Sequence, residues 1–407
     1  MPALGLVRAV CRGGAGSSPG VSMPSQAARP AIIPFLRANL AQRRRPCRMR
    51  RSKVDESTSM AISYHIEEAD LSTAAAAIQG LWVANLVGHD ARSAAAKLRL
   101  GYAENPAGTG TAILLYPQGD DRPSGVQGLH PRLFHFGTRR LRAAGLADYA
   151  VDEAHRSLGP ALMLMRRGSE LGAERFDLTY GLPNRKAAAV VARAGLKRIG
   201  MVQRYAKPLR SRALLAQRLP QALAAMCAPL VDAALRLRDA LRSAGSRTRL
   251  ECRDSDWSDA ALDQLWARRP GALLLSDRSA AMLRWRFGTP ERGDWKLCIA
   301  SDEAGTVQGH VIWRMHDGFA EIGDFFSTDP DALTAPLILA FTRLARRAGA
   351  NSISVTFFGR EPVASALLAS GMVPRPQEAP LFKLPGGPLE LDAAEHWYLT
   401  SFDNDAD

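Results

Sequence analysis

The sequence has few cysteines, and none are grouped in a way that could hold a metal ion or build a disulfide framework. The five cysteines stand far apart, with no Cys-x-x-Cys pair and none beside a pair of histidines. The eight histidines form no His-Glu-x-x-His motif. These absences exclude the common zinc sites and the small disulfide-rich domains. We therefore expect no metal cofactor, and a reducing, cytoplasmic location fits the chain best.

Long apolar runs are also missing. A membrane-spanning helix needs about 18 to 20 consecutive apolar residues. The longest candidate, Ala222–Leu237, is interrupted by Pro229, Asp232 and Arg236. No transmembrane span is therefore expected. With 46% hydrophobic residues, the 407-residue chain can nevertheless form the cores of two ordinary domains.

Acidic residues are absent from the first 53 positions, where all eleven charged side chains are Lys or Arg. This segment accounts for most of the net charge of +13, because the other residues carry 42 Lys and Arg against 40 Asp and Glu. We expect residues 1–59 to be a disordered basic extension; a transit peptide or a contact with nucleic acid or anionic lipid are the alternatives. Since the remaining charge is nearly balanced, no specific nucleic-acid partner is expected.

The rest of the chain contains an internal repeat. The two copies of its opening are Ile78-Gln-Gly-Leu-Trp82 with Leu98-Arg-Leu-Gly-Tyr102, and Leu262-Asp-Gln-Leu-Trp266 with Leu283-Arg-Trp-Arg-Phe287. Similar order and spacing indicate a duplicated domain. We expect a first domain over 60–210, a helical connector over 211–246, a second domain over 247–385 and an acidic tail over 386–407. The connector is expected to pack on a domain or to lie at a membrane interface.

The strongest functional pattern lies in residues 151–195. A strand ends at Val151 and is followed by Arg156-Ser-Leu-Gly-Pro-Ala161, a helix, a strand over 176–180 and a helix over 185–194. Gly159 lets the backbone approach a ligand, and the helix that begins there exposes N–H groups and the positive end of its dipole. This arrangement suits a pyrophosphate, to which Arg156 would add positive charge. An ordinary strand–helix–strand unit with a glycine at its turn is the alternative.

The segment resembles the acyl-CoA-binding core of the GNAT superfamily of acyltransferases, whose Arg/Gln-x-x-Gly-x-Gly/Ala motif is met by Arg156, Gly159 and Ala161. The resemblance implies an α/β fold with a mixed central sheet flanked by helices, here in two tandem copies. It implies acetyl-CoA as acyl donor and direct attack by a small-molecule primary amine, with amino sugars among the candidates. The residues that the resemblance places at the donor are Val151, Arg156, Ser157, Leu158, Gly159, Ala161, Leu162 and Asn184.

The resemblance leaves the proton donor open. Val191 stands where many family members have a tyrosine that protonates the leaving thiolate, so Tyr205 and Tyr180 are the candidates, although both also fit as packed aromatics. Asp148, on the strand before the loop, is the candidate base, and a structural ion pair is its other interpretation. The remaining candidates for the base are Glu153 and His155.

The second copy has no equivalent loop. Aligning Gly172 with Gly349, the glycines near the ends of the corresponding helices, puts Pro336 at the position of Gly159. Carboxylates that would repel a pyrophosphate stand nearby, namely Asp324, Asp329 and Asp331. We therefore expect a non-catalytic copy that shapes the acceptor site or forms a homodimer.

Two other functions stay open at this point. One is an aminoacyl-transfer enzyme of the peptidoglycan-precursor type, which the tandem arrangement also resembles but which would not need the phosphate loop. The other is a non-catalytic protein that binds CoA or a partner, which the loss of the usual tyrosine at Val191 favours.

Overall fold

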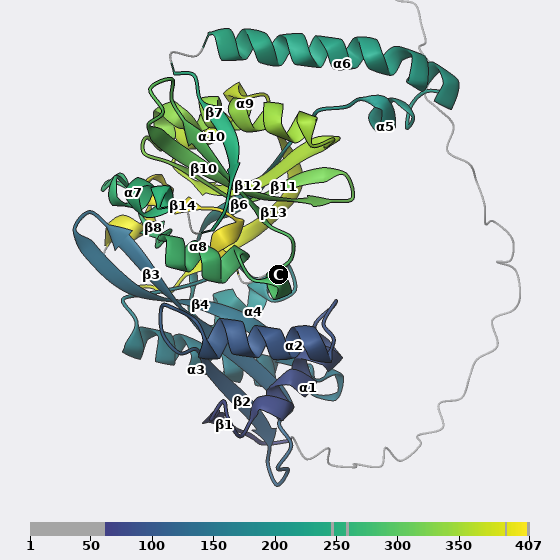
Figure 1. Ribbon diagram of the computed structural model, residues 1–407. Coiled ribbons are helices and arrows are strands. Elements are labelled where there is room, and N and C mark those ends of the chain that lie inside the picture. The colour runs from purple at the N-terminus through teal and green to yellow at the C-terminus, as the bar shows by residue number, and fades with distance from the viewer. Residues whose placement is uncertain (1–61, 246–247, 258–259, 387–388, 405–407) are drawn as a thin grey trace, which may run out of the picture. The chain divides into compact units, whose positions relative to one another are not determined.

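The computed structural model describes residues 62–245, 248–257, 260–386 and 389–404, all within one compact unit. The predicted basic extension over 1–59 lies outside the described residues. A single 14-stranded sheet runs through this unit (Figure 1). Its strands are β1 Tyr64–Glu68, β2 Thr111–Pro117, β3 Gly125–Phe136, β4 Arg139–Val151, β5 Leu178–Gly181, β6 Lys197–Pro208, β7 Glu251–Ser255, β8 Leu275–Ser276, β9 Lys296–Ser301, β10 Val307–His316, β11 Phe319–Ser327, β12 Ser352–Gly359, β13 Val373–Lys383 and β14 Tyr398–Leu399.

Helices cover the sheet in both halves of the unit. They are α1 Ala75–Asn85, α2 Ala91–Lys97, α3 Leu158–Arg175, α4 Ala188–Arg193, α5 Arg212–Leu215, α6 Gln221–Ala244, α7 Ala261–Ala267, α8 Ala280–Phe287, α9 Pro330–Arg347 and α10 Glu361–Ala369. Strand residues alternate between the two faces. In β2, Ile113 and Leu115 pack with α3, whereas Ala112 and Leu114 pack with α1 and α2. The mixed sheet with helices on its faces, as predicted, is confirmed.

The strand order shows one succession of elements occurring twice, with the last strands exchanged. The order is β1-β2-β3-β4-β5-β13-β6-β12-β11-β10-β9-β7. The parallel pairs are β4 with β5 in the first half and β11 with β12 in the second. Strand β6, which closes the first succession, pairs with β12 of the second, and β13 pairs with β5 of the first. This exchange joins the two halves into one sheet, so the domain boundaries near 210 and 247 stay predictions.

The predicted register between the two copies was wrong. Helices α3 and α9 both have 18 residues, so their first residues correspond and Gly159 matches Asp331, five positions before the residue that the sequence alignment selected. The two glycines used for that alignment occupy different structural positions. Gly172 lies inside α3, where a Cβ would come within 2.6 Å of the Thr179 hydroxyl, whereas Gly349 follows α9 in a left-handed turn with φ 89°.

The segment predicted as an acidic tail contributes to the core. Strand β14 pairs with β12 through Phe358 with Leu399 and Gly359 with Tyr398. Tyr398 and Leu399 are fully buried. Residues 389–404 therefore include a strand that is packed inside the second half.

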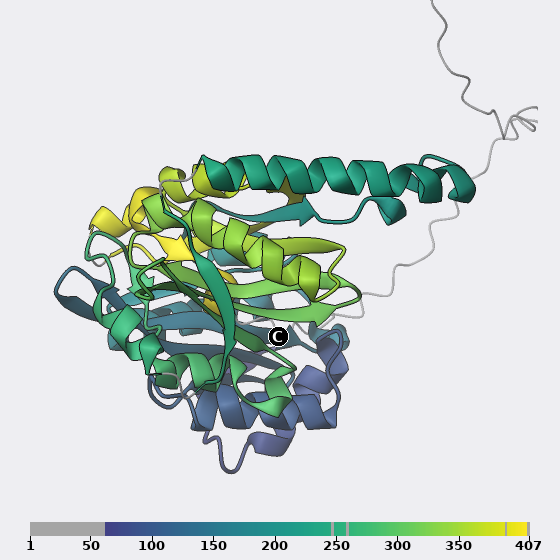
Figure 2. The same ribbon diagram turned by 45° about the horizontal axis from the view of Figure 1, so that its top comes forward.

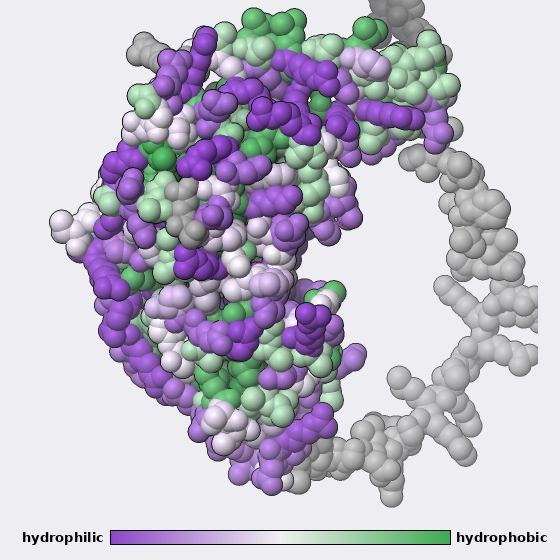
Figure 3. Space-filling view, viewed as in Figure 1, coloured by the Kyte–Doolittle hydropathy of each residue, from purple (hydrophilic) through white to green (hydrophobic). Residues whose placement is uncertain are grey.

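Helix α6 forms most of the predicted connector and lies along α9 (Figures 1 and 2). Its inward side buries Ala224, Ala228 and Asp239. Its exposed side is largely apolar but also carries Arg236 and Arg238, and Figure 3 shows green and purple residues side by side along it. The exposed large apolar residues of α5, α6 and the turn between them are Leu214, Leu219, Leu223, Met226, Leu230, Val231, Leu237 and Leu241. Within the described ranges, no helix combines the length and the hydropathy that a bilayer span requires.

Candidate active site

A cavity opens where β4 and β5 separate. The two strands pair in parallel from Ala143 with Leu178 to Leu146 with Gly181, and their pairing stops there. Beyond this point β4 continues to Val151, while the chain after β5 turns away toward α4. The space between them is a cavity of about 480 Å³. A narrower hollow, lined by His130, adjoins this cavity and shares five lining residues with it, Leu146 and Gly181 among them.

Asp148 stands on a bulge of β4 at the wall of this cavity. The register between β3 and β4 shifts between Val126 and Gly128, and Asp148 has φ 52°, in the left-handed region that Asp adopts more readily than most residues. A regular strand points successive side chains to opposite faces. With the bulge, the successive residues Ala147, Asp148 and Tyr149 all line the cavity.

The buried carboxylate of Asp148 holds three polar side chains from other elements. Its Oδ1 lies 2.8 Å from Lys97 Nζ. Its Oδ2 accepts a hydrogen bond of 2.9 Å from the Tyr102 hydroxyl and lies 3.0 Å from His130 Nε2. Tyr102 reaches Asp148 across Gly128, where any Cβ would overlap the tyrosine hydroxyl. The glycine in β3 is therefore required for this cluster to form.

The charges around Asp148 keep it ionised. Burial alone would raise the pKa of this carboxyl, but Lys97 and His130 more than offset burial and hold the pKa well below its usual range. A carboxylate with so low a pKa is a weak proton acceptor at neutral pH. It is well suited, however, to stabilise a positive charge on a neighbouring imidazole, as the buried aspartate does in a catalytic triad.

Two further residues define the chemistry of the cavity wall. Val191, at the position of the family's tyrosine, lines the cavity from α4 and brings no hydroxyl to it. Tyr149 lines the same cavity from β4, and burial raises the pKa of its phenol to about 12. The Tyr149 phenol is thus protonated at neutral pH and holds a proton at the cavity wall, although its raised pKa makes it a weak acid.

The glycine loop lies directly after β4. Ser157 is the N-cap residue of α3, and a Cβ added at Gly159 would meet nothing within 4 Å, so the first turn faces open space. The Nε atom of Arg156 donates to the carbonyl of Val151 at 2.9 Å, and its Nη2 donates to Asn85 Oδ1 at 2.8 Å. Arg156 therefore ties the loop to β4 and α1 as well as adding positive charge.

Of the predicted donor residues, Asn184 lines the cavity, whereas those between Val151 and Leu162 are not among its lining residues; of the two predicted catalytic residues, Asp148 lines it and Tyr205 does not. Ala161 and Leu162 follow Gly159 in the first turns of α3, and Asn184 lines the cavity on the opposite side, after β5. The Asn184 Oδ1 atom accepts from the backbone of residues 186 and 187, so it also shapes the turn into α4. Tyr205 packs in the core of the second half, away from the residues that line the cavity.

Sequence reasoning missed several residues of the site. Asn404 lines the cavity, and Asp403 accepts a hydrogen bond of 3.0 Å at its carbonyl from the hydroxyl of Tyr180, one of the predicted acid candidates, so the end of the described chain borders the site. Lys97, Tyr102 and His130 were also missed, because their relation to Asp148 depends on the bulge. Tyr149 could have been found from the sequence, because it directly follows Asp148, which was already a candidate.

The second half contains a similar buried cluster but no open gap. Asp324 Oδ2 lies 2.9 Å from His310 Nε2, and Arg278 pairs with the same carboxylate. Burial would raise the pKa of Asp324, but Arg278 and His310 lower it. The prediction that Asp324 faces a phosphate position was therefore wrong, because this residue lies in the core. In this half, Tyr398 of β14 bridges the gap between β11 and β12.

The other two predicted carboxylates do lie at the start of α9. Asp329 caps the helix by accepting from Ala332 N at 3.1 Å, and Asp331 pairs with Arg360 at 2.6 Å. The carboxylate of Asp329 thus already accepts a hydrogen bond from the first turn of α9. Elsewhere in the described ranges, no group of three or more His, Cys, Asp or Glu side chains is placed to hold a metal ion.

No family model and no curated protein matches the chain. Crystal structures do match it. A conserved protein from Enterococcus faecalis V583, described as a "Probable N-Acyltransferase", superposes with a TM-score of 0.56 at 11% identity, over 79% of this chain and 72% of that one. A GCN5-related N-acetyltransferase from Anabaena variabilis superposes with a TM-score of 0.53 at 13% identity, over the same shares of the two chains. Identities this low establish the fold alone. The chain has the fold of the GCN5-related N-acetyltransferases.

Proposed function

We propose that this protein is an acyl-CoA-dependent N-acyltransferase that moves an acyl group, expected to be acetyl, to a primary amine. The observation that carries the proposal is the gap between β4 and β5, which opens beside an uncapped helix start. Strand β4, which borders the gap, ends at Val151, and α3 begins seven residues later at Leu158. Such a pair provides one site for a pyrophosphate and an adjoining space for an apolar arm with a thioester.

The residues present fit the donor. The first N–H groups of α3 have no carbonyl partner within the helix, and Gly159 leaves the approach to them open. Beyond Leu146, no described strand pairs with the β5-facing edge of β4, so a pantetheine arm can lie along this edge. Met165 and Val191 supply an apolar wall.

Acyl-CoA supplies a thioester carbonyl that an amine can attack; a C–N bond forms and the C–S bond breaks. The amine loses one proton and the thiolate gains one. Tyr149, which is protonated at neutral pH, is our candidate donor to the thiolate. His130 is the candidate acceptor of the amine proton, with Asp148 stabilising the imidazolium that results. Asp148 thereby remains essential, through the histidine rather than as the direct base.

Acetyl-CoA binding by calorimetry tests the donor site. The Gly159→Glu variant places a carboxylate against the helix start and is expected to weaken binding by at least about tenfold through like-charge repulsion. Gly80→Glu is the matched control, because Gly80 is another helical glycine whose Cβ would meet nothing within 4 Å. Absence of binding by the unchanged protein would overturn the proposal and favour the aminoacyl-transfer alternative.

Turnover tests the reaction. Release of free CoA thiol in the presence of a panel of primary amines, amino sugars included, is expected for the unchanged protein. Binding of acetyl-CoA without turnover of any amine would support the second candidate, a non-catalytic CoA-binding protein. The observation that favours this candidate is Val191, which lines the cavity where a hydroxyl is expected.

A further inference from the structure

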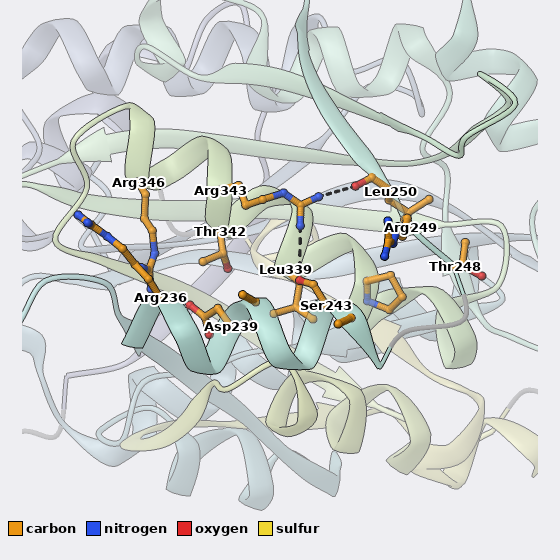
Figure 4. Close-up of a pocket in the computed structure, with 13 residues that line it drawn as sticks. Arg236, Asp239, Ser243, Thr248, Arg249, Leu250, Leu339, Thr342, Arg343 and Arg346 are labelled. Carbon is orange, nitrogen blue, oxygen red and sulfur yellow. Dashed lines mark hydrogen bonds and ion pairs between the residues drawn. The ribbon is translucent and has the colours of Figure 1, made fainter. Parts of the chain in front are cut away.

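A second cavity, of about 520 Å³, lies between α6 and α9, in a different part of the unit from the proposed acyltransferase site. Figure 4 shows α6 along one side and α9 along the other, with Arg343 between them. The volume is in the range of cavities that bind small ligands. Its polar lining residues are Arg236, Asp239, Ser243, Thr248, Arg249, Thr342, Arg343 and Arg346.

The cavity has more positive charge than its own residues neutralise. Four of its 13 lining residues are arginines, and Asp239 is the one carboxylate among them. This carboxylate is already shared by two cations: its Oδ1 lies 3.0 Å from Lys207 Nζ and its Oδ2 lies 2.6 Å from Arg346 Nη2. The remaining arginine charges therefore have no carboxylate partner in the cavity wall.

Arg346 carries the clearest sign of an unmet anion. Its Nε and Nη1 atoms are buried and have no hydrogen-bond partner among the described residues. A buried donor without a partner is costly, and more so when it is charged. Burial lowers the pKa of Arg346, Asp239 opposes this shift, and the charge of Arg236 adds to it. An anion in the cavity would offset the repulsion between Arg346 and Arg236.

The rest of the lining is apolar. It consists of Ala240, Ala244, Leu250, Pro336 and Leu339. Ala240 and Ala244 also border the outward side of α6, where Leu237 and Leu241 are exposed. Apolar surface thus continues from the cavity onto the outside of the helix. A small inorganic anion would leave this surface in water, whereas a ligand with an apolar chain would cover it.

We propose that the cavity between α6 and α9 binds an amphiphile that carries one carboxylate or phosphate on an apolar chain. Its anionic group pairs with Arg346 and the arginines beside it, and its chain lies along the alanine and leucine residues of α6. A free fatty-acid anion and the headgroup end of an anionic lipid share this chemistry. The site is separate from the acyl-CoA site and does not depend on it.

The test uses decanoate as the probe, with calorimetry on the full chain. Ala240→Glu puts a carboxylate into the cavity from an exposed position and is expected to weaken decanoate binding by at least about tenfold. Ala234→Glu is the matched control: the same change, at an exposed alanine of the same helix that does not line the cavity. Each new glutamate has an arginine four residues away, at Arg236 or Arg238, so local helix effects are similar.

Equal decanoate affinity in Ala240→Glu and the unchanged protein would overturn the proposal. Inorganic phosphate has the charge without the chain, and octyl glucoside below its micelle concentration has the chain without the charge. If either binds as tightly as decanoate, the ligand is not an amphiphilic anion and the proposal fails. Acetyl-CoA affinity is expected to be the same in both variants, which separates this result from the acyltransferase proposal.

Vesicle flotation distinguishes the two sources of the amphiphile. Vesicles of phosphatidylglycerol with phosphatidylcholine are compared with phosphatidylcholine alone. Flotation that requires phosphatidylglycerol and is lost in Ala240→Glu but not in Ala234→Glu identifies a membrane lipid. Decanoate binding without flotation identifies a free amphiphile. If the unchanged protein binds neither decanoate nor vesicles, the inference is wrong.

Discussion

The hydroxyl of Tyr398 donates a hydrogen bond of 2.7 Å to the carbonyl oxygen of Phe325. This bond joins β14 to β11 at the place where β11 and β12 separate. The same place in the first half is a cavity of about 480 Å³. The two halves share one succession of strands, yet the chain fills one of the two gaps with its own C-terminal strand. Among the described residues, the gap between β4 and β5 thus stays open, whereas β14 fills the gap between β11 and β12.

We expect one acyl-CoA to bind per chain. The second gap is closed by β14, and the start of α9 carries Asp329 and Asp331, which repel a pyrophosphate. Calorimetric titration with acetyl-CoA should give a stoichiometry near one, and Gly159→Glu should remove that single site. A stoichiometry near two, or a site that survives in Gly159→Glu with normal affinity, would contradict this assignment.

Asp148→Asn should abolish most turnover while the equivalent change in the second half does not. We expect a fall in kcat of about 100-fold or more, since general acid–base groups contribute roughly that much. Asp324→Asn is the control, because Asp324 is equally buried and paired with a histidine but lies outside the cavity. Both changes should lower the free energy of unfolding by about 3 kcal/mol, the cost of breaking a buried ion pair. Equal losses of kcat would show that Asp148 acts through stability alone.

Tyr149→Phe and Tyr205→Phe decide between the residue that lines the cavity and the one predicted from sequence. Removing the Tyr149 hydroxyl should lower kcat by about 10-fold to 100-fold, because the proton donor to the thiolate is lost. Tyr205→Phe should leave kcat nearly unchanged, since this side chain packs in the other half. The reverse result would identify Tyr205 as the proton donor.

The local part of the fold could be predicted from the sequence. Between Val151 and Gly195, alternation, the loop glycine and the helix-ending glycine are signals carried by neighbouring residues, and they located β4, α3, β5 and α4. The exchange of β6 and β13 could not be predicted in this way. Side-chain alternation tells which face of a strand is buried but does not identify its neighbour in the sheet.

The position of the loop could be predicted from the sequence, and its role in donor binding stays a prediction; the polar cluster could not be predicted. Asp148 was selected because it precedes the loop, yet its partners Lys97 and Tyr102 lie 51 and 46 residues earlier in the chain. They meet only because β4 bulges at Asp148 and because Gly128 lets the tyrosine cross β3. Neither a left-handed aspartate nor a close approach across a strand leaves a pattern that spacing reveals.

Lys207 should make the stability of the protein rise with pH above neutrality. It is fully buried beneath α6 and α9, and its Nζ atom contacts Asp239, the Thr342 hydroxyl and the Ser370 carbonyl. Burial lowers the pKa of this amine from 10.5 to about 8, although Asp239 opposes the shift. Between these two values the unfolded chain holds a proton that the folded chain has lost, so unfolding becomes less favourable as the pH increases.

The comparison is between the unchanged protein and Lys207→Met, with the free energy of unfolding measured by denaturant titration at pH 7.5 and pH 10. The unchanged protein should gain about 2 kcal/mol relative to the variant over this interval, from the two pKa values of the lysine. Lys197→Met, on the same strand but exposed, controls for the loss of any lysine. If the difference between Lys207→Met and the unchanged protein does not vary with pH, the buried amine keeps its proton throughout. Asp239 would then stabilise the charge of Lys207 more than burial destabilises it.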